Sequence, residues 1–453
     1  MPGHEPDAAA DGAAAVEGTP EVVPDALAEL DEPVLEPIPQ PDPEPAPLLE
    51  LRDGLPPIVD TDAALAETVA AFAAGTGPVA IDAERASGYR YSARAYLVQL
   101  RREGSGTALV DPIAFDHLDD LDAALGDAEW ILHAASQDLA CLAEVGLRPS
   151  SLFDTELAGR LLGYPRVGLA TLVEQVLGRS LRKEHSAVDW STRPLPEPWL
   201  EYAALDVEAL IELREVLGRE LEETGKAEWA RQEFEHLVHA PPSGPRQEPW
   251  RRTSGMHRAR GRRALAAVRA LWETRDDLAS RRDVTPGRII PDSSIVEAAI
   301  AMPQDKSALI GLRGFRGRGA SRYAHQWVEA LRAARTLPEA DLPTAAARFD
   351  GPPPPRAWAD RDPVAAARLT SARTALALVA EKHHLPVENL LTPDYVRRLM
   401  WEPPADDGDL PAAVTTRLVD LGARPWQVEL TRDVLVSAIE SPSDTGAPAA
   451  PDA

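Results

Sequence analysis

The chain has 453 residues, a net charge of −26 and a single cysteine, Cys141. This length exceeds what one hydrophobic core supports and predicts several domains. One cysteine excludes an intramolecular disulfide, so the chain is not a disulfide-rich secreted domain. A signal peptide and any run of about 18 apolar residues are both missing, which predicts a soluble, cytoplasmic protein with no membrane partner.

Charge is distributed unevenly along the chain. Residues 1–55 are mostly Pro, Ala, Asp and Glu, and residues 442–453 are similar. Such segments bury too little apolar surface to repay the entropy of ordering, so both are predicted to be disordered tails. Between them, residues 246–263 and 313–322 are rich in arginine. The net charge of the chain is therefore negative although its middle part is basic.

A layered α/β domain is predicted over residues 56–225. Short apolar runs between turn signals predict strands at residues 79–84, 94–102, 106–112 and 129–135. Helical periodicity and helix start signals predict helices at residues 116–126, 136–146, 152–163, 169–178 and 195–225. Strands followed by helices indicate a sheet covered by helices.

Acidic residues recur where these predicted elements end. Asp82 and Glu84 are two apart in a strand, so their side chains share one face. Asp138 lies at the turn from a strand to a helix, and Tyr202 and Asp206 are four apart on one helical face. The pair in the strand also fits a solvated strand end. The recurrence favours a cluster of four carboxylates.

Such a cluster has a known chemistry. Buried carboxylates without partners are costly, whereas oxygen-rich clusters suit Mg²⁺ or Mn²⁺. Two such ions, about 4 Å apart, activate a water and stabilise the leaving oxygen in phosphodiester hydrolysis. A metal-dependent phosphodiesterase is therefore expected.

The same residues lie in familiar motifs. The segments IDAE (81–84), HAASQDL (133–139) and YAALD (202–206) resemble the exonuclease motifs of the DEDD superfamily, in its tyrosine branch. Residues 189–207, DWSTRPLPEPWLEYAALDV, closely resemble ribonuclease D. The resemblance implies a ribonuclease H-like fold, a mixed sheet flanked by helices. It also implies that Tyr202 positions the attacking water and that two divalent ions are held by Asp82, Glu84, Asp138 and Asp206.

The chain differs from ribonuclease D proteins directly after its first acidic pair. Those proteins continue with a bulky aromatic or aliphatic residue, whereas residues 85–96 read RASGYRYSARAY. This difference affects how the terminal nucleotide is held and leaves the metal ligands in place. Nearby, His133 fits a satisfied strand histidine as well as a catalytic one, and Asp154 fits a helix cap.

The rest of the chain is predicted to be helical. Residues 262–303 and 309–334 resemble the HRDC domain, a small helical bundle found in ribonuclease D and some helicases. Residues from Leu278 and from Val379 align without a gap at their apolar positions, which indicates a tandem repeat. The predicted order is a linker (226–257), an HRDC domain (258–336), a Pro-rich linker (337–362) and a second HRDC-like domain (363–441). The second repeat lacks an Arg-Gly loop and is predicted to be a packing partner.

Arginines of the first helical module are candidate contacts for RNA phosphates. They could also be solvated residues that keep an Ala-rich surface soluble. The candidates are Arg258, Arg260, Arg262, Arg263, Arg313, Arg316, Arg318 and Arg322.

The expected function is a metal-dependent 3′-to-5′ exoribonuclease that acts on RNA 3′ ends, with tRNA precursors as candidate substrates. A DNA 3′-to-5′ exonuclease remains an alternative, because HRDC modules also occur with DNA helicases. An inert nucleic-acid-binding protein is a third reading, and the intact acid set with its tyrosine argues against it.

Overall fold

The structure, a computed structural model, describes residues 46–182, 187–241, 244, 246–345, 351–405 and 408–442. Predictions for residues 1–45 and 443–453 lie outside these ranges. Within the described ranges, no helix is both long and apolar enough to cross a membrane.

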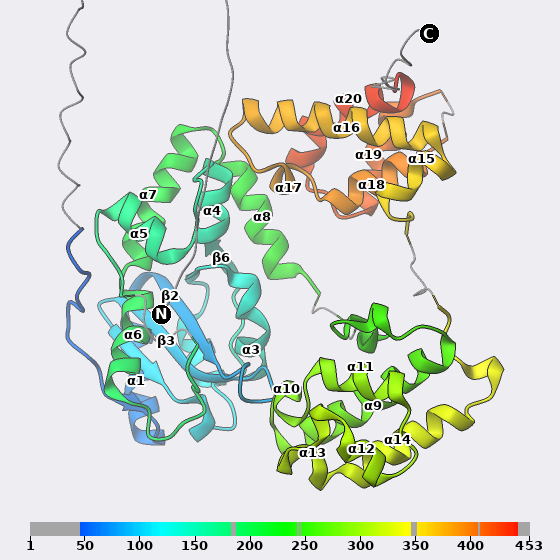
Figure 1. The fold of residues 1–453 in the computed structure, drawn as a ribbon. Coiled ribbons are helices and arrows are strands. Elements are labelled where there is room, and N and C mark those ends of the chain that lie inside the picture. The colour runs from blue at the N-terminus through cyan, green and yellow to red at the C-terminus, as the bar shows by residue number, and fades with distance from the viewer. Residues whose placement is uncertain are drawn as a thin grey trace, which may run out of the picture. The chain divides into compact units, whose positions relative to one another are not determined.

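A six-stranded mixed sheet forms the centre of the α/β domain (Figure 1). Its order is β1-β4-β3-β2-β5-β6; β2, β3 and β4 are antiparallel neighbours and the outer pairs are parallel. The strands are β1 (Ile58–Val59), β2 (Thr76–Arg85), β3 (Ala95–Glu103), β4 (Gly106–Val110), β5 (Glu129–Leu132) and β6 (Ser151–Asp154). This is the mixed sheet flanked by helices that the resemblance implied.

Helices cover both faces of this sheet. They are α1 (Asp62–Ala74), α2 (Asp119–Leu125), α3 (Leu139–Glu144), α4 (Thr155–Leu162), α5 (Leu169–Leu177), α6 (Glu197–Glu208), α7 (Leu210–Glu223) and α8 (Ala227–His239). Val79, Ile81 and Ala83 pack on the side of α1, α2 and α3. The residues between them therefore face α6 and α7 on the other side, because side chains alternate along a strand.

Two predicted helices differ from the structure. The helix expected over residues 195–225 is divided at Ala209, whose backbone N–H bonds to Val207, so α6 packs on β2 to β4 and α7 reaches β5. Residues 152–154, expected in a helix, belong to β6 because parallel pairing with β5 decides their conformation. Asp154 caps the following helix α4, as predicted, by accepting backbone N–H bonds from Glu156 and Leu157.

The N-terminal boundary of the ordered chain is a correction. Residues 46–55, assigned above to the acidic tail, lie on the α/β domain. The backbone N–H of Leu49 donates to the carbonyl oxygen of Ser180 at 2.9 Å, and the N–H of Ser180 donates to Pro47 at 2.8 Å. Leu49 is buried. Residues 46–55 therefore resemble the acidic tail in composition, although they include a short segment that pairs with a loop distant in sequence.

A buried ionic network also holds this segment. Glu208, which is 1 % exposed, lies 3.2 Å from Arg52 and 3.1 Å from Arg101. Asp53 also pairs with Arg101, at 3.1 Å. Because Glu208 is the last residue of α6, the segment fixes the end of that helix.

The remaining helices form two modules of similar order. The first contains α9 (Arg262–Arg282), α10 (Pro286–Ile289), α11 (Asp292–Ala301), α12 (Lys306–Gly311), α13 (Arg318–Arg322) and α14 (Ala324–Thr336). The second contains α15 (Trp358–Arg361), α16 (Pro363–Lys382), α17 (Val387–Leu390), α18 (Pro393–Trp401), α19 (Leu410–Asp420) and α20 (Pro425–Glu440). In both, a long helix is followed by a four-residue helix, and the ungapped repeat places Ile289 opposite Leu390, both buried.

The second module packs on α8. The indole rings of Trp229 and Trp426 stack with their centroids 5.1 Å apart. Glu233 accepts hydrogen bonds from Arg424 at 2.6 Å and from the Trp426 indole at 2.8 Å. These contacts agree with the predicted role of this module as a packing partner.

Candidate active site

Three of the predicted metal ligands meet between β2 and α6. Asp82 and Glu84 extend from β2 on the face that α6 covers, and Asp206 extends from α6. One oxygen of each carboxylate lies within 4.8 Å of the other two. All three side chains are partly exposed to a cleft of about 520 Å³, so an ion could reach them.

Asp138 lines the same cleft but has a different partner. It precedes α3 and is 5 % exposed. Its Oδ1 atom lies 3.4 Å from the Nη2 atom of Arg85, which also lines the cleft. The fourth predicted ligand is therefore near the other three and is paired with a side chain of the protein.

A second carboxylate fixes the turn that carries Asp138. Asp154 accepts hydrogen bonds from the backbone N–H groups of Ala134 and Ala135, at 3.0 and 2.9 Å. Ala134 has a left-handed conformation, with φ of 58°, which is uncommon for a residue with a Cβ atom. The two hydrogen bonds stabilise this turn. Asp154 therefore caps α4 and also holds the turn that places Asp138 in the cleft.

Tyr202 lies one helical turn before Asp206 and lines the cleft. The Tyr202 hydroxyl donates a hydrogen bond to the Asp206 carboxylate. Ala203 and Ala204 of the same helix are fully buried, and these small side chains let α6 approach the sheet closely. The helix thus brings the phenol and the carboxylate toward the acids of β2.

The acids perturb one another strongly. Burial raises the pKa of Asp82 to about 6. Burial, followed by repulsion from Asp82, Asp206 and Asp138, raises the pKa of Glu84 to about 10. Burial and repulsion from Asp82 raise the pKa of Asp138 to about 8, and burial raises the pKa of Asp206 well above its usual value. Bound protons or cations would relieve this repulsion.

The donor set fits a hard divalent cation. It consists of carboxylate oxygens, which suit Mg²⁺ and Mn²⁺ better than softer metals. The nearby His133 also lines the cleft, but its Nδ1 atom lies 2.9 Å from the Thr155 hydroxyl. Burial lowers the pKa of His133 to about 4, so its ring is neutral at pH 7. These contacts agree with a satisfied strand histidine.

The cleft contains side chains that the sequence did not single out. Arg85 follows Glu84 directly, and that adjacency was the available signal. Gln137, Glu156 and Arg182 come from other turns and helices and carry no local motif. Of these, Arg85 is the one that contacts a predicted metal ligand.

The segment after Arg85 contacts the first helical module. The Tyr89 carbonyl accepts a hydrogen bond from the backbone N–H of Thr285 at 3.0 Å. Asp283 accepts hydrogen bonds from the backbone N–H groups of Tyr91 and Ser92, each at 3.1 Å. Residues in the segment 85–96, which is rich in small and basic side chains, therefore connect the α/β domain to the first helical module.

The candidate arginines near the start of α9 have different surroundings. Arg262 donates to the carbonyl oxygen of Leu342 at 2.7 Å, and Arg263 donates to those of Ala334 and Leu337 at the end of α14. These hydrogen bonds give both side chains a structural role. Arg258 and Arg260, just before α9, are exposed.

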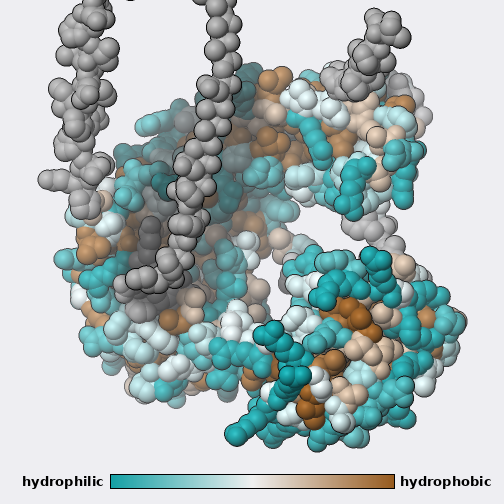
Figure 2. Space-filling model, in the orientation of Figure 1, coloured by the Kyte–Doolittle hydropathy of each residue, from teal (hydrophilic) through white to brown (hydrophobic). Residues whose placement is uncertain are grey.

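The remaining candidates surround α13 on a well-anchored loop. Phe315 is fully buried and its ring lies 6.2 Å from that of Trp327. A Cβ atom on Gly314 would lie 2.0 Å from the hydroxyl of Ser294, so only glycine fits there. Figure 2 shows strongly hydrophilic side chains standing out near α13. The exposed arginines of this loop are Arg313, Arg316, Arg318 and Arg322.

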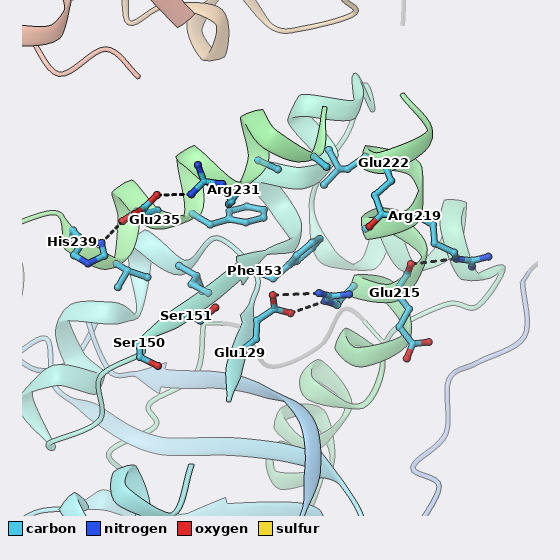
Figure 3. A pocket seen from close by; sticks show the side chains of 18 residues that line it. Glu129, Ser150, Ser151, Phe153, Glu215, Arg219, Glu222, Arg231, Glu235 and His239 are labelled. Atoms are coloured by element: carbon cyan, nitrogen blue, oxygen red, sulfur yellow. Dashed lines mark hydrogen bonds and ion pairs between the residues drawn. The ribbon is translucent and has the colours of Figure 1, made fainter. Parts of the chain in front are cut away.

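A larger cavity, of about 690 Å³, lies between β6, α7 and α8 (Figure 3). Glu129 and Arg214 pair across it at 2.7 Å, Arg231 pairs with Glu235 at 2.8 Å, and Phe153 lies between these pairs. These charges are satisfied by one another. The acidic cluster of the smaller cleft is the candidate for chemistry.

Three domain families match the chain. Residues 56–222 match the 3′-5′ exonuclease family, residues 264–331 the HRDC domain, and residues 351–439 the 3′ to 5′ exonuclease C-terminal domain. The expected HRDC-like module at the C-terminus thus matches a separate family, although its helices repeat the order of the first module.

Whole-chain comparisons agree with these domains. Ribonuclease D of Gluconacetobacter diazotrophicus is 32% identical over 337 residues, which cover 72% of this chain and 82% of that protein. A crystal structure of a protein from Bifidobacterium adolescentis is 39% identical, with a TM-score of 0.79 over 87% of this chain and all of that one. Escherichia coli RNase D is 26% identical, with a TM-score of 0.63 over 85% of this chain and 99% of that one.

A mixed sheet with an acidic cluster at the end of β2, inside a matched exonuclease domain, defines a hydrolytic 3′-5′ exonuclease. Exonuclease domains of this kind depend on divalent metal ions. With its HRDC domain and its similarity over 82% of the ribonuclease D of Gluconacetobacter diazotrophicus, the chain belongs to the ribonuclease D family.

Proposed function

We propose that the protein removes nucleotides from RNA 3′ ends, including those of tRNA precursors, by hydrolysis that uses two divalent ions, Mg²⁺ or Mn²⁺. The observation that carries this proposal is the group of Asp82, Glu84 and Asp206, with ligand atoms within 4.8 Å of one another, beside Asp138 in one cleft. The solved relative from Escherichia coli, described as an exoribonuclease involved in structured RNA processing, supports RNA as the substrate.

The chain supplies the ligands and the orientation of water. Asp82, Glu84, Asp138 and Asp206 would hold the ions, which supply charge for an attacking water and a leaving oxygen. The Tyr202 hydroxyl, held by Asp206, orients the water toward phosphorus. The new bond joins the water oxygen to phosphorus, and the bond from phosphorus to the 3′ oxygen breaks. The water gives up a proton and the leaving 3′ oxygen takes one up, so the shortened RNA keeps a 3′ hydroxyl and a nucleoside 5′-monophosphate is released.

Arginines at the surface of the first helical module would hold the RNA farther from its end. Arg313, Arg316 and Arg318 are exposed on the loop around α13, where guanidinium groups can reach phosphates. This contact with RNA is independent of the cleft, and so it should affect long substrates more than short ones.

The proposal is tested by incubating purified protein with matched RNA and DNA strands in Mg²⁺, Mn²⁺ or EDTA. Mononucleotides should appear from the RNA with either metal and should not appear in EDTA. Asp206→Asn, which keeps the shape of the side chain, should release none. Faster release from DNA would establish the DNA exonuclease instead, since the difference depends on contacts to the 2′ hydroxyl. Failure to release nucleotides from either strand with either metal would indicate an inert protein.

A further inference from the structure

Arg85 is a cation within the acidic cluster. Its side chain is 29% exposed, lines the cleft and lies 3.4 Å from Asp138, whose side chain is 7% exposed. Among the ion pairs of the described residues, this is the one that involves a predicted metal ligand of the cleft. Asp138 therefore has a cationic partner within the protein itself.

The end of β2 explains how Arg85 enters the cleft. Glu84 pairs with Leu97 of β3, but Arg85 pairs with Ala95, so the register shifts between Glu84 and Arg85 and Tyr96 is the extra residue. Ala95 packs with Ile81 and Ala83 on the side of α1 to α3, and its partner Arg85 continues their alternation toward that side. Asp138 directly precedes α3 on the same side of the sheet. The guanidinium at the end of β2 therefore reaches Asp138 beside the other carboxylates.

Charge balance indicates what this guanidinium does. Two divalent cations would balance the four predicted metal ligands of the cleft, and Glu156 already pairs with Arg160, which leaves the charge of Arg85 in excess. A metal ion on Asp138 would also compete with Arg85 for the same oxygen. A guanidinium released from a carboxylate is well suited to a phosphate, because both anions present two oxygens to its planar fork.

We propose that Arg85 is an exchangeable counter-ion of the catalytic centre. It pairs with Asp138 before metal binds and contacts a non-bridging phosphate oxygen of the substrate once metal takes Asp138. The inference rests on the proposed function, to which it adds a phosphate-binding residue. It predicts that Arg85 opposes the binding of metal and favours the binding of phosphate.

The first measurement is the Mn²⁺ affinity of substrate-free, full-length protein by isothermal titration calorimetry. Arg85→Gln removes the competing cation and should tighten Mn²⁺ binding by about three- to tenfold, the range expected for a partly exposed charge pair. Arg85→Lys keeps the charge and should stay within about twofold of the wild type. A matched control is Arg182→Gln, because Arg182 lines the same cleft but pairs with Glu201 at 3.2 Å. It should leave Mn²⁺ affinity unchanged.

The second measurement is the binding of adenosine 5′-monophosphate at saturating Mn²⁺. This product carries the phosphate of the cleaved bond and is not hydrolysed further by the same reaction. Arg85→Gln should weaken its binding by about tenfold, as expected for a lost charge-assisted hydrogen bond. Arg182→Gln should not weaken it.

The outcomes separate the two proposals. Mn²⁺ binding that is unchanged or weaker in Arg85→Gln would overturn the exchange, and so would unchanged binding of the product. Weaker Mn²⁺ binding would show instead that Arg85 positions Asp138 for the metal. An Arg85→Lys variant that binds Mn²⁺ as tightly as Arg85→Gln would also overturn it. Wild-type protein that neither binds Mn²⁺ nor hydrolyses RNA would overturn the proposed function together with this inference.

Discussion

Arg193 donates two hydrogen bonds to the carboxylate of Asp111, at 2.6 and 2.7 Å. Asp111 follows β4 and is 6 % exposed, whereas Arg193 lies in the segment that leads into α6. The same guanidinium also donates to the backbone carbonyl groups of Tyr96 and Trp190. This pair therefore ties the segment before the helix that carries Tyr202 to the end of β4.

Replacing Arg193 by Ala should destabilise the protein and slow hydrolysis. The change leaves the buried Asp111 carboxylate without its partner, which typically costs about 3 kcal/mol. Thermal unfolding followed by circular dichroism would show this as a lower midpoint. As a control, Arg231→Ala removes two exposed pairs on α8, with Glu228 and Glu235, and should leave the midpoint and turnover unchanged. Equal midpoints for the two variants would show that the pair contributes little.

Tyr202→Phe should reduce turnover on a short RNA by about 10²-fold, the size of effect that a positioned proton-transfer or water-orienting group supplies. The change removes only the hydroxyl that is bonded to Asp206, so the carboxylates remain. Mn²⁺ affinity, measured by calorimetry, should stay close to that of the wild type. Full turnover in this variant would make the phenol a packing group, and lost Mn²⁺ binding would show that it supports the ligands instead.

The acidic cluster should make stability depend on pH when metal is absent. Burial raises the pKa of Asp82 to about 6, above its ordinary value of 3.8. The folded protein then holds this proton more tightly than the unfolded chain, so the contribution of Asp82 to stability falls as pH rises from about 4 to 6 and is constant above that window. In EDTA, Asp82→Asn should gain stability relative to the wild type over this window, by at most about 3 kcal/mol.

Urea unfolding of both proteins between pH 4 and pH 8 measures this difference, and added Mg²⁺ should reduce it because a cation replaces the proton. Asp82→Asn should at the same time be inactive. A stability difference that is the same at pH 4 and pH 8 would contradict the predicted proton uptake, whatever the activity of the variant.

The arginine loop should bind long RNA. Replacing Arg313, Arg316 and Arg318 by Ala should weaken the binding of long RNA much more than the hydrolysis of a short substrate. Each lost phosphate contact should lower the slope of log affinity against log salt by about 0.7. Filter binding or fluorescence anisotropy at several salt concentrations gives this slope. Arg281 and Arg332, exposed and paired within their own helices, are control positions that should leave it unchanged.

In contrast, Arg263→Ala should lower the stability of the first helical module rather than its affinity for RNA. The reason is that Arg263 donates a hydrogen bond to a backbone carbonyl group near the end of α14. An unchanged slope in the triple variant would mean that the α/β domain grips the substrate alone. Lost RNA binding in Arg263→Ala, with an unchanged unfolding midpoint, would move the contact to the start of α9.

Two N-terminal truncations should behave differently. Removing Met1–Glu44 should leave the unfolding midpoint unchanged, because the contacts of Leu49 and Arg52 remain. Removing residues 1–53 should lower it, because the buried Glu208 loses Arg52 as a partner and Leu49 no longer covers its site. Calorimetric scans of both proteins test this. Equal midpoints would show that residues 45–53 contribute nothing to the stability of the α/β domain.

The sequence predicted those features that local geometry determines. Alternation along β2 placed Asp82 and Glu84 on one face, the four-residue spacing placed Tyr202 beside Asp206, and the cap at Asp154 followed from its position before a helix. These relationships involve neighbours in the chain, so a periodic pattern or a capping preference was enough to identify them.

Features that depend on distant partners were missed or misplaced. The strand β6 forms because residues 151–154 pair with β5. Residues 46–49 are ordered because the backbone of Ser180, far along the chain, accepts a hydrogen bond from Leu49 and donates one to Pro47. The pair of Arg85 with Asp138 joins two elements that carry no shared motif. Composition and spacing contain no information about such contacts, so the structure was needed to find them.

The alternation of β2 also limits how this gene segment can change in length. Inserting or deleting one codon before Asp82 would exchange the two sides of the strand: the carboxylates would enter the apolar layer under α1 to α3, and Ile81 would face the cleft. Folding and catalysis would fail together. The register shifts between Thr76 and Val79 and after Glu84 are the places where β2 and β3 already tolerate unequal lengths. Natural or engineered changes in length should therefore be accepted at these two shifts and rejected between Val79 and Glu84.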